Sequence, residues 1–136
     1  MSNGNVKVYL AGAVYNRTVI NALSEALTRL VLVNTTIEIV SSWHKQPTPN
    51  NMQDCLSMDR VDIDNSDIII ATYPYGTGTS GEIGYGVGKG IPTYYFRDRL
   101  CTYDEHDPLF SHCEEVEHIT SFDKLISVLR EVAENG

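Results

Sequence analysis

The sequence predicts a single α/β domain: a flavodoxin-like, or Rossmann-like, parallel sheet of about five strands with helices on both faces. One observation is that strand-type and helix-type segments alternate along all 136 residues, which implies parallel strands joined by right-handed crossovers. The other is that residues 67–72, DIIIAT, have an unbroken apolar centre, which is typical of a strand covered on both faces. The length fits one domain over residues 1–136.

The first half of the chain contains two predicted strands and two predicted helices. Residues 6–11 are rich in β-forming side chains, and residues 36–41 alternate between polar and apolar, so we predict a strand in each range. Residues 17 to about 31 place apolar side chains at helical spacing, which predicts a helix with one buried face. A polar loop with two prolines follows, and a second helix is predicted over about 52–65.

The second half contains three predicted strands and two predicted helices. In chain order they are the strand 67–72, a short helix over about 80–88, the strand 92–96, the strand 116–119 and an amphipathic helix over 121–134. A loop rich in glycine and proline covers residues 73–81, and an irregular stretch covers residues 97–115.

Composition excludes several functional classes. Hydrophobic residues make up 42% and charged residues 21% of the chain, as in ordinary soluble globular proteins. The formal net charge of −8 would repel a phosphate backbone, so no nucleic-acid polymer is expected as a partner. We see no membrane helix, no signal peptide and, from three cysteines, no disulfide framework. We therefore expect a cytoplasmic protein.

Ligands of open parallel sheets bind beyond the carboxyl ends of the strands. That rule selects the loops after Ala11, at residues 41–44 and at residues 73–81. Gly12 would let the backbone approach a ligand there, and His44 would line the pocket. We find no dinucleotide-binding or P-loop motif and no zinc pattern, so neither a metal nor a cofactor is expected.

Glu82 is the first candidate for chemistry. The predicted helix boundary places it in a first turn, where free N–H groups and the helix dipole would keep its carboxylate ionised. Such a carboxylate is suited to act as a glycosidic nucleophile. The alternative is purely structural, because residues 79–82, TSGE, also fit a capping box. The two roles can coexist.

Two further features are ambiguous on the sequence alone. Four aspartates at positions 59, 62, 64 and 67 form an acidic run, which for any single residue is more simply a solvated helix face. Tyr9 lies in the predicted strand 6–11, which leads into the turn at Gly12. It could equally well be an aromatic residue of the core whose hydroxyl is hydrogen-bonded.

Taken together, several segments resemble the nucleoside 2-deoxyribosyltransferase superfamily, which includes base-exchanging transferases and nucleoside 5′-monophosphate N-glycosidases. The segments are VKVYLAG at 6–12, DR at 59–60, NSDIIIA at 65–71, GTSGEIGY at 78–85 and GKGIP at 88–92. The resemblance covers most of the chain, and it rests on the order and spacing of the motifs.

The resemblance implies roles for individual residues. Glu82 would attack the anomeric carbon and form a glycosyl-enzyme intermediate, Tyr9 would orient Glu82, and Asp59 would position the sugar or handle the proton of the departing base. Phe110 and Ser111 would close the pocket of a neighbouring subunit, so the resemblance implies a homodimer or higher homo-oligomer with shared active sites.

The sequence also departs from the family pattern. Many transferases carry an aspartate that contacts the base where this chain has Gly76. We take Gly76, Thr77, Gly78 and Thr79 as the substrate-binding stretch, in which either threonine could replace that aspartate. Arg17 could meet a 5′-phosphate, although an exposed position at the start of a helix explains it as well.

These observations predict cleavage of an N-glycosidic bond of a nucleoside, with Glu82 as nucleophile and Asp59 as the acid/base partner. Transfer of the deoxyribosyl group to a second base is the expected outcome. One alternative is hydrolysis of a 5′-monophosphate, with Arg17 and Ser111 as phosphate contacts. Another is a non-catalytic nucleotide-binding module, and a weaker one is cleavage of NAD.

Overall fold

The computed structural model describes residues 5–13, 16–30, 35–47, 49–73, 77–97 and 109–135. Its elements are β1 (Asn5–Ala11), α1 (Arg17–Thr28), β2 (Thr36–Ile39), α2 (Met52–Asp64), β3 (Ile68–Thr72), α3 (Thr77–Gly88), β4 (Thr93–Phe96), the 3₁₀ helix η3 (Leu109–His112), β5 (Val116–Ile119) and α4 (Phe122–Asn135). Every predicted helix and strand is therefore present, and η3 lies in the stretch that the sequence left irregular.

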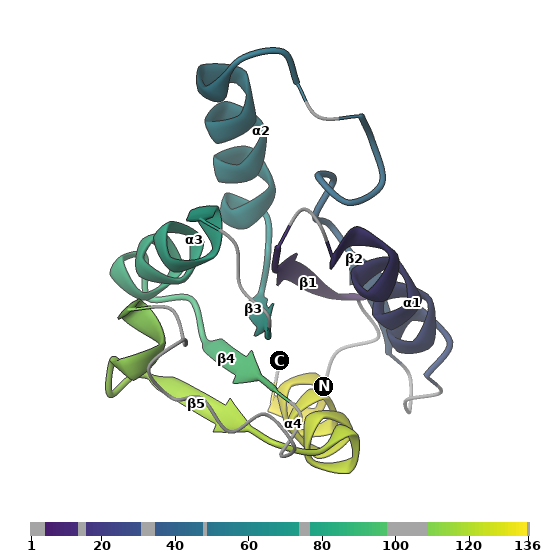
Figure 1. The fold of residues 1–136 in the computed structure, drawn as a ribbon. Coiled ribbons are helices and arrows are strands. Elements are labelled where there is room, and N and C mark those ends of the chain that lie inside the picture. The colour runs from purple at the N-terminus through teal and green to yellow at the C-terminus, as the bar shows by residue number, and fades with distance from the viewer. Residues whose placement is uncertain are drawn as a thin grey trace.

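The strands form one parallel sheet in the order β2-β1-β3-β4-β5. Helices α2 and α3 cover one face, and α1 and α4 cover the other (Figure 1). This order confirms the predicted flavodoxin-like α/β fold, in which the strand order reverses beside β1. By this rule a ligand is expected at the carboxyl end of β1.

Burial follows the predicted patterns. All five residues of β3 are buried, as expected for the central strand of a covered sheet, whereas the edge strand β2 alternates between exposed and buried residues. Helix α4 buries Leu125, Val128, Leu129 and Ala133, and the Lys124 N–H donates to Ser121 Oγ at 3.2 Å at its start. In the described part of the chain, no helix has both the length and the apolar character needed to cross a membrane.

The edge strand β2 ends two residues earlier than predicted. Its pairing with β1 stops at Ile39, and side chains of the following loop then take over the hydrogen bonds of Leu10. The Leu10 N–H donates to Ser41 Oγ at 3.1 Å, and Trp43 Nε1 donates to the Leu10 carbonyl oxygen at 2.7 Å. The loop therefore caps the edge of β1 next to Tyr9.

Helix α3 contains an unusual number of glycines, and two of them permit close packing. A Cβ at position 86 would lie 2.2 Å from Ile69 Cδ1 of β3, and one at position 84 would lie 2.9 Å from the Phe110 ring of η3. The helix ends in a Schellman motif: Gly90 has a φ of +76°, its N–H donates to the Val87 carbonyl, and the Ile91 N–H donates to the Gly86 carbonyl. Glycine thus lets α3 lie close to the sheet.

Candidate active site

Three of the predicted site residues meet at the carboxyl end of β1. Tyr9 extends from β1 and is fully buried, and its hydroxyl donates to Glu82 Oε2 of α3 at 2.6 Å. The carboxyl group of Asp59 of α2, which like Glu82 is only partly exposed, interacts with both of them, since each contributes to its pKa. We call Tyr9, Asp59 and Glu82 the buried cluster. Residues far apart in the sequence are brought together because β1, α2 and α3 converge here (Figure 1).

The buried cluster raises the proton affinity of Glu82. The residue keeps a small exposed surface, but removal of its carboxyl group from water raises the pKa of Glu82 to about 8. The hydrogen bond from Tyr9 opposes this change, whereas the charge of Asp59 and the hydrogen bond with it add to the increase. Glu82 therefore holds a proton at neutral pH in the free protein.

Asp59 and Tyr9 are shifted in the same direction. Burial raises the pKa of Asp59, the hydrogen bonds with Glu82 and Tyr9 lower it, and the charge of Asp62 raises it again. Burial and the neighbouring carboxylates raise the pKa of the Tyr9 hydroxyl well above its usual value. Within the described residues, no lysine or arginine forms an ion pair with either carboxyl group. Both carboxyl groups therefore bind a proton more tightly than an ordinary carboxylate does.

Two predictions about Glu82 are wrong. Helix α3 begins at Thr77, so Glu82 lies in its second turn, and the first turn contains no acidic residue. The capping-box interpretation of Thr79 and Glu82 fails for the same reason. Nor is Glu82 kept ionised by helix N–H groups, because those N–H groups lie one turn earlier and burial dominates its pKa. The predicted loop extended to residue 81, whereas the helix begins at Thr77.

The acidic run divides into residues with different partners. Asp62 Oδ2 accepts from the Ser42 N–H at 3.0 Å, Asp67 Oδ2 accepts from the Lys7 N–H at 2.8 Å, and Asp64 binds side chains of α3. Asp59 is different: its Oδ1 is buried and has no hydrogen-bond partner among the residues that the structure describes. Of the four aspartates, Asp59 alone has a buried oxygen atom without a hydrogen-bond partner in the described part of the chain, and a ligand could satisfy it.

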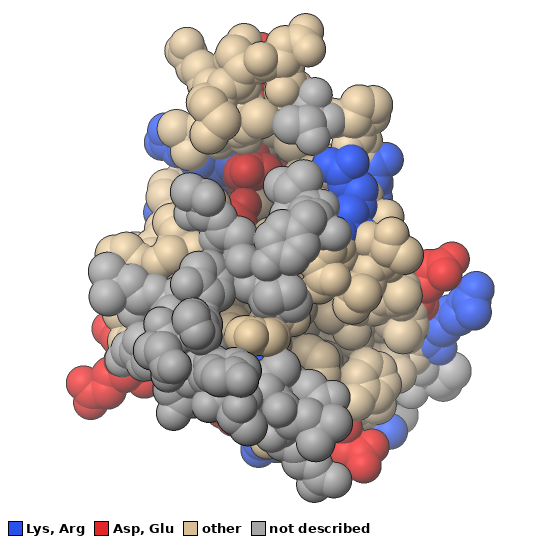
Figure 2. Space-filling model, in the orientation of Figure 1, with Lys and Arg blue, Asp and Glu red and all other residues tan. Residues whose placement is uncertain are grey.

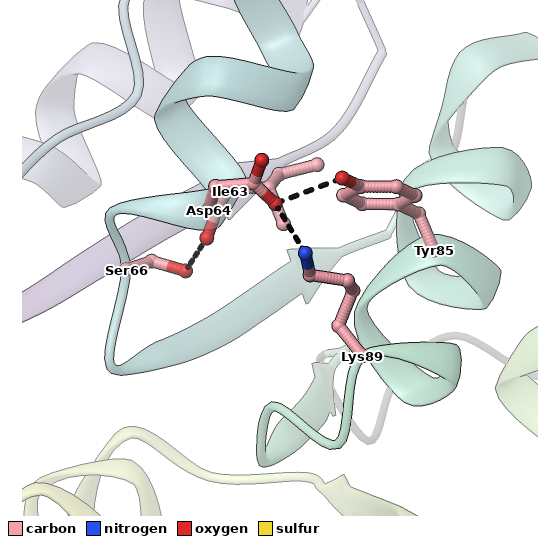
Figure 3. Close-up of polar contacts among 5 residues, drawn as sticks. All are labelled: Ile63, Asp64, Ser66, Tyr85 and Lys89. Atoms are coloured by element: carbon pink, nitrogen blue, oxygen red, sulfur yellow. Dashed lines mark hydrogen bonds and ion pairs between the residues drawn. The ribbon is translucent and has the colours of Figure 1, made fainter.

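A second carboxylate cluster joins the same two helices on the surface (Figure 3). Tyr85 Oη donates to Asp64 Oδ1 at 2.8 Å, and Lys89 Nζ lies 3.3 Å from the same oxygen. We call Asp64, Tyr85 and Lys89 the surface cluster. Here the hydrogen bond from Tyr85 and the Lys89 ammonium lower the pKa of Asp64. This cluster is a satisfied structural contact between α2 and α3.

His44 occupies a different environment from the one predicted. Its ring is almost fully buried, and both ring nitrogens bind within the chain, Nε2 to Ser41 Oγ at 2.6 Å and Nδ1 to Asn21 Oδ1 at 2.8 Å. Because Asn21 Nδ2 donates to the His44 carbonyl, Nδ1 must carry the proton. Burial lowers the pKa of His44 to about 4, so the ring is neutral and holds the loop instead of lining an open pocket.

Gly12 and Arg17 lie at the neighbouring β1–α1 connection. A Cβ at position 12 would lie 2.7 Å from Thr72 Oγ1 and 2.8 Å from Ile20 Cδ1, so Gly12 is needed for packing as well as for any ligand. Arg17 is the first residue of α1, and it is partly buried instead of exposed. Its Nη2 donates to the Trp43 carbonyl oxygen at 3.3 Å.

The remaining predicted residues differ in exposure. Gly76 and the side chain of Thr77 lie outside the described residues, Gly78 is exposed, and Thr79 is almost fully buried. Phe110 is partly exposed, with its ring against Gly84 of α3.

Ser111 is fully buried in its own chain, and His118 Nε2 donates to its carbonyl oxygen at 2.7 Å. This burial arises because η3 folds back onto α3 and β5. The contact of Ser111 with a substrate or a neighbouring subunit stays a prediction.

Sequence reasoning missed the residues that support the buried cluster. Ser41 fitted the last position of a strand, Asn21 fitted the polar face of a helix, and Asp62 fitted a solvated run. Instead, Ser41 accepts from the Leu10 N–H of β1, and Asn21 and Asp62 bind the loop at residues 41–44. The available signal was that these polar side chains flank the point where the strand order of such a sheet reverses, which is where ligands bind.

The surface over this region combines both charges. Acidic atoms reach the surface below the projecting end of α2, and basic atoms lie beside them toward α1 (Figure 2). A small polar ligand could therefore be bound at both an acidic and a basic group.

Comparisons with known proteins show likeness at the level of fold. No protein-family model matches the chain, and no curated protein matches it significantly. A conserved protein from Enterococcus faecalis V583 superposes with a TM-score of 0.62 at 16% identity, over 96% of this chain and 99% of that one. The CMP N-glycosidase BcmB of Clostridium botulinum superposes with a TM-score of 0.56 at 18% identity, over 90% and 97% respectively.

Proposed function

We propose that this protein cleaves the N-glycosidic bond of a nucleoside or nucleoside 5′-monophosphate through a covalent intermediate on Glu82. The buried cluster carries the proposal: two carboxyl groups, Asp59 and Glu82, are held together with the Tyr9 hydroxyl, beyond the switch point of the sheet. The fold shared with a CMP N-glycosidase supports it, as does the resemblance of the sequence motifs to the nucleoside 2-deoxyribosyltransferase superfamily.

The energetics favour catalysis over passive binding. Placing two carboxyl groups together and away from water is unfavourable unless a cation compensates them, and no described lysine or arginine pairs with them. Strongly perturbed carboxyl groups of this kind concentrate at catalytic sites. A binding module would have no need for them.

The first chemical step needs one proton on the pair of carboxyl groups. In the reactive form, the proton lies on Asp59 and Glu82 is a carboxylate, so the proton must first move from Glu82 to Asp59. Glu82 Oε1 then attacks the anomeric carbon, while Tyr9 holds Oε2. The carbon–nitrogen bond breaks with its electron pair going to the base, and Asp59 donates its proton to that base.

The second step releases the sugar. Asp59, now a carboxylate, removes a proton from the acceptor, which attacks the anomeric carbon and displaces Glu82. The ester bond breaks with its electron pair returning to Glu82, so the pair regains its single proton. With a second base as acceptor the result is transfer, which is the outcome predicted from the sequence. With water it is hydrolysis.

A 5′-monophosphate substrate is favoured by one observation. Arg17 is partly buried at the start of α1, and Trp43 holds its guanidinium near the carboxyl end of β1. A guanidinium at such a helix start is suited to bind phosphate. In this alternative Arg17 and Ser111 are the phosphate contacts predicted from the sequence. We keep the cytoplasmic location as a prediction from the sequence.

We also propose that the protein acts as a homo-oligomer. Met52, Leu56 and Val61 of α2 and Phe110 of η3 are large apolar side chains that are exposed in the single chain. Such residues are enriched at interfaces when they lie together. Measurement of the solution mass by light scattering tests this, and a monomer that releases base at full rate contradicts shared active sites.

The experiment that tests the function is chromatographic detection of base release. The protein is incubated with each deoxynucleoside and each deoxynucleoside 5′-monophosphate, with and without a second free base. A new nucleoside that appears only with the second base identifies a transferase, and free base from the monophosphates without exchange identifies the hydrolase. If no substrate is cleaved, the proposal is wrong, and a binding role takes its place.

A further inference from the structure

Helix α2 carries Asp59, yet apolar burial holds this helix only weakly. Ile63 is its one buried residue, among the described side chains of the helix, and Met52 and Leu56 near its start are 82% and 57% exposed. The start of the helix projects from the body of the protein (Figure 1). Within the single chain, polar contacts therefore contribute to its position, beside the packing of Ile63 and of the partly buried Met58.

Asp62 makes a polar contact between α2 and the loop at residues 41–44. Asp62 and Asp59 are three positions apart, so they lie on neighbouring parts of one helix face. Asp62 Oδ2 accepts from the Ser42 N–H at 3.0 Å. A carboxylate that accepts from a backbone N–H makes a charge-assisted bond, which is stronger than a neutral one.

Ser42 is in turn fixed relative to Tyr9. Its neighbours Ser41 and Trp43 bind the N–H and the carbonyl of Leu10, which is the residue after Tyr9 in β1. A continuous set of hydrogen bonds thus runs from α2 through Asp62 and the loop at residues 41–44 to the strand that holds the Tyr9 hydroxyl.

We infer that Asp62 is a positioning residue: its bond to the Ser42 N–H fixes α2 against the loop at residues 41–44 and so sets the Asp59 carboxyl group beside Glu82 and Tyr9. The effect of Asp62 on catalysis rests on the proposed function. The placement of Asp59 itself can be measured without any substrate.

Asp62 also acts through its charge. The groups that face Asp59 are Tyr9 from β1, Glu82 from α3 and Asp62 from its own helix. The charge of Asp62 raises the pKa of both Asp59 and Tyr9. The two effects are separable, because asparagine at position 62 keeps an oxygen acceptor for the Ser42 N–H and removes the charge, whereas alanine removes both.

The test compares Asp62→Asn and Asp62→Ala with matched substitutions at Asp67. Asp67 makes the same type of bond, to the Lys7 N–H at 2.8 Å, at the opposite end of β1. We expect Asp62→Ala to lower kcat by about tenfold or more, since a hydrogen bond to a charged group contributes about 1.5–3 kcal/mol. Asp62→Asn should keep kcat near wild type and move the acidic limb of the pH profile to lower pH. Asp67→Asn and Asp67→Ala should change neither.

Carbon-13 NMR titration of the side-chain carboxyl groups gives a readout that needs no activity. Asp62→Asn should lower the pKa of Asp59, and Asp67→Asn should leave it unchanged. If the wild type releases no base but these shifts occur, the proposed function fails and the positioning inference stands. If the Asp59 signal is the same in wild type, Asp62→Asn and Asp62→Ala, or if Asp67→Ala lowers kcat as much as Asp62→Ala, the inference is wrong.

Discussion

Two tyrosine–carboxylate clusters link α2 and α3, and they differ in almost every physical respect. In the surface cluster, Tyr85 donates to Asp64 at 2.8 Å and Lys89 supplies a positive charge. In the buried cluster, Tyr9 donates to Glu82 at 2.6 Å, and the other neighbour is a second carboxyl group, that of Asp59. A tyrosine and a carboxylate therefore occur together twice. In the surface cluster a lysine compensates the negative charge, and in the buried cluster no described lysine or arginine does so.

The difference appears in the pKa values. The pKa of Asp64 is lowered, with the hydrogen bond from Tyr85 as the largest cause, whereas burial raises the pKa of Glu82 to about 8. A contact selected only for stability is expected to resemble the surface cluster. A buried pair that holds a proton at neutral pH is instead suited to proton transfer. The comparison thus separates a helix contact from a candidate catalytic centre.

The largest expected effect comes from removing the nucleophile. Glu82→Gln keeps the size of the side chain but cannot form the ester, so we expect kcat/KM for base release to fall by about 10³-fold or more. Asp64→Asn makes the same chemical change in the surface cluster and should leave kcat/KM within about twofold. Circular dichroism confirms that both variants fold.

Either of two results would remove the distinction between the clusters. Base release by Glu82→Gln at a near-normal rate would leave Glu82 as a packing residue. A comparable loss of activity in Asp64→Asn would show that the contact between α2 and α3, and not the chemistry of Glu82, limits the rate.

A smaller effect is expected from the two tyrosines. Tyr9→Phe removes the hydrogen bond that orients Glu82, and we expect kcat to fall by roughly 10- to 100-fold, the value of one hydrogen bond to a charged group. The Tyr9 hydroxyl lowers the pKa of Glu82 and, through a separate interaction, that of Asp59, so both limbs of the pH profile should move to higher pH in Tyr9→Phe. Tyr85→Phe is the matched control.

The pH profile decides how Tyr9 acts. If Tyr9→Phe lowers kcat but leaves both limbs in place, Tyr9 is a packing residue whose loss disturbs the site. If Tyr85→Phe moves the limbs as well, the two clusters are coupled through the helices, and the comparison between them no longer holds.

The fold could be predicted from the sequence because its signals are local. The apolar run of β3 and the helical spacing in α1 and α4 depend on near neighbours in the chain, and a parallel sheet follows from the alternation of strands and helices. Boundaries were missed where tertiary contacts override local pattern. Residue 41 continues the alternation of β2, but its side chain binds Leu10 instead.

The site could be predicted only in part, because burial and partners are not local. The motifs selected Tyr9, Asp59 and Glu82, and the structure brings these three together. No pattern in the acidic run shows that Asp59 points inward while Asp64 points to Tyr85. Nor could the sequence show that burial raises the pKa of Glu82. The predicted position in the first turn of a helix would have lowered that pKa.

A third expected effect, on stability and not on activity, distinguishes the clusters by the sign of its pH dependence. Glu82 has a folded pKa of about 8 against an ordinary value of 4.5, so between these values the folded state holds a proton that the unfolded state has released. The free energy of unfolding of wild type, relative to Glu82→Gln, should therefore fall as pH rises from about 4.5 to 8. The total change should be a few kcal/mol, since one pKa unit corresponds to about 1.4 kcal/mol. Asp64, with a pKa below 3.8, should show the opposite dependence relative to Asp64→Asn.

Urea denaturation at pH 3, 5, 7 and 9 measures both differences. The stabilisation from Asp64 is present above its ordinary pKa and is lost as the pH falls through the folded value, so its change is confined to the acidic end. The change from Glu82 should lie between pH 5 and 8 and be absent at higher pH. If the curve for Glu82→Gln runs parallel to wild type over that range, the buried carboxyl group has an ordinary pKa. Asp59 would then have no proton to receive from Glu82 at neutral pH, and the proposed acid catalysis would need another donor.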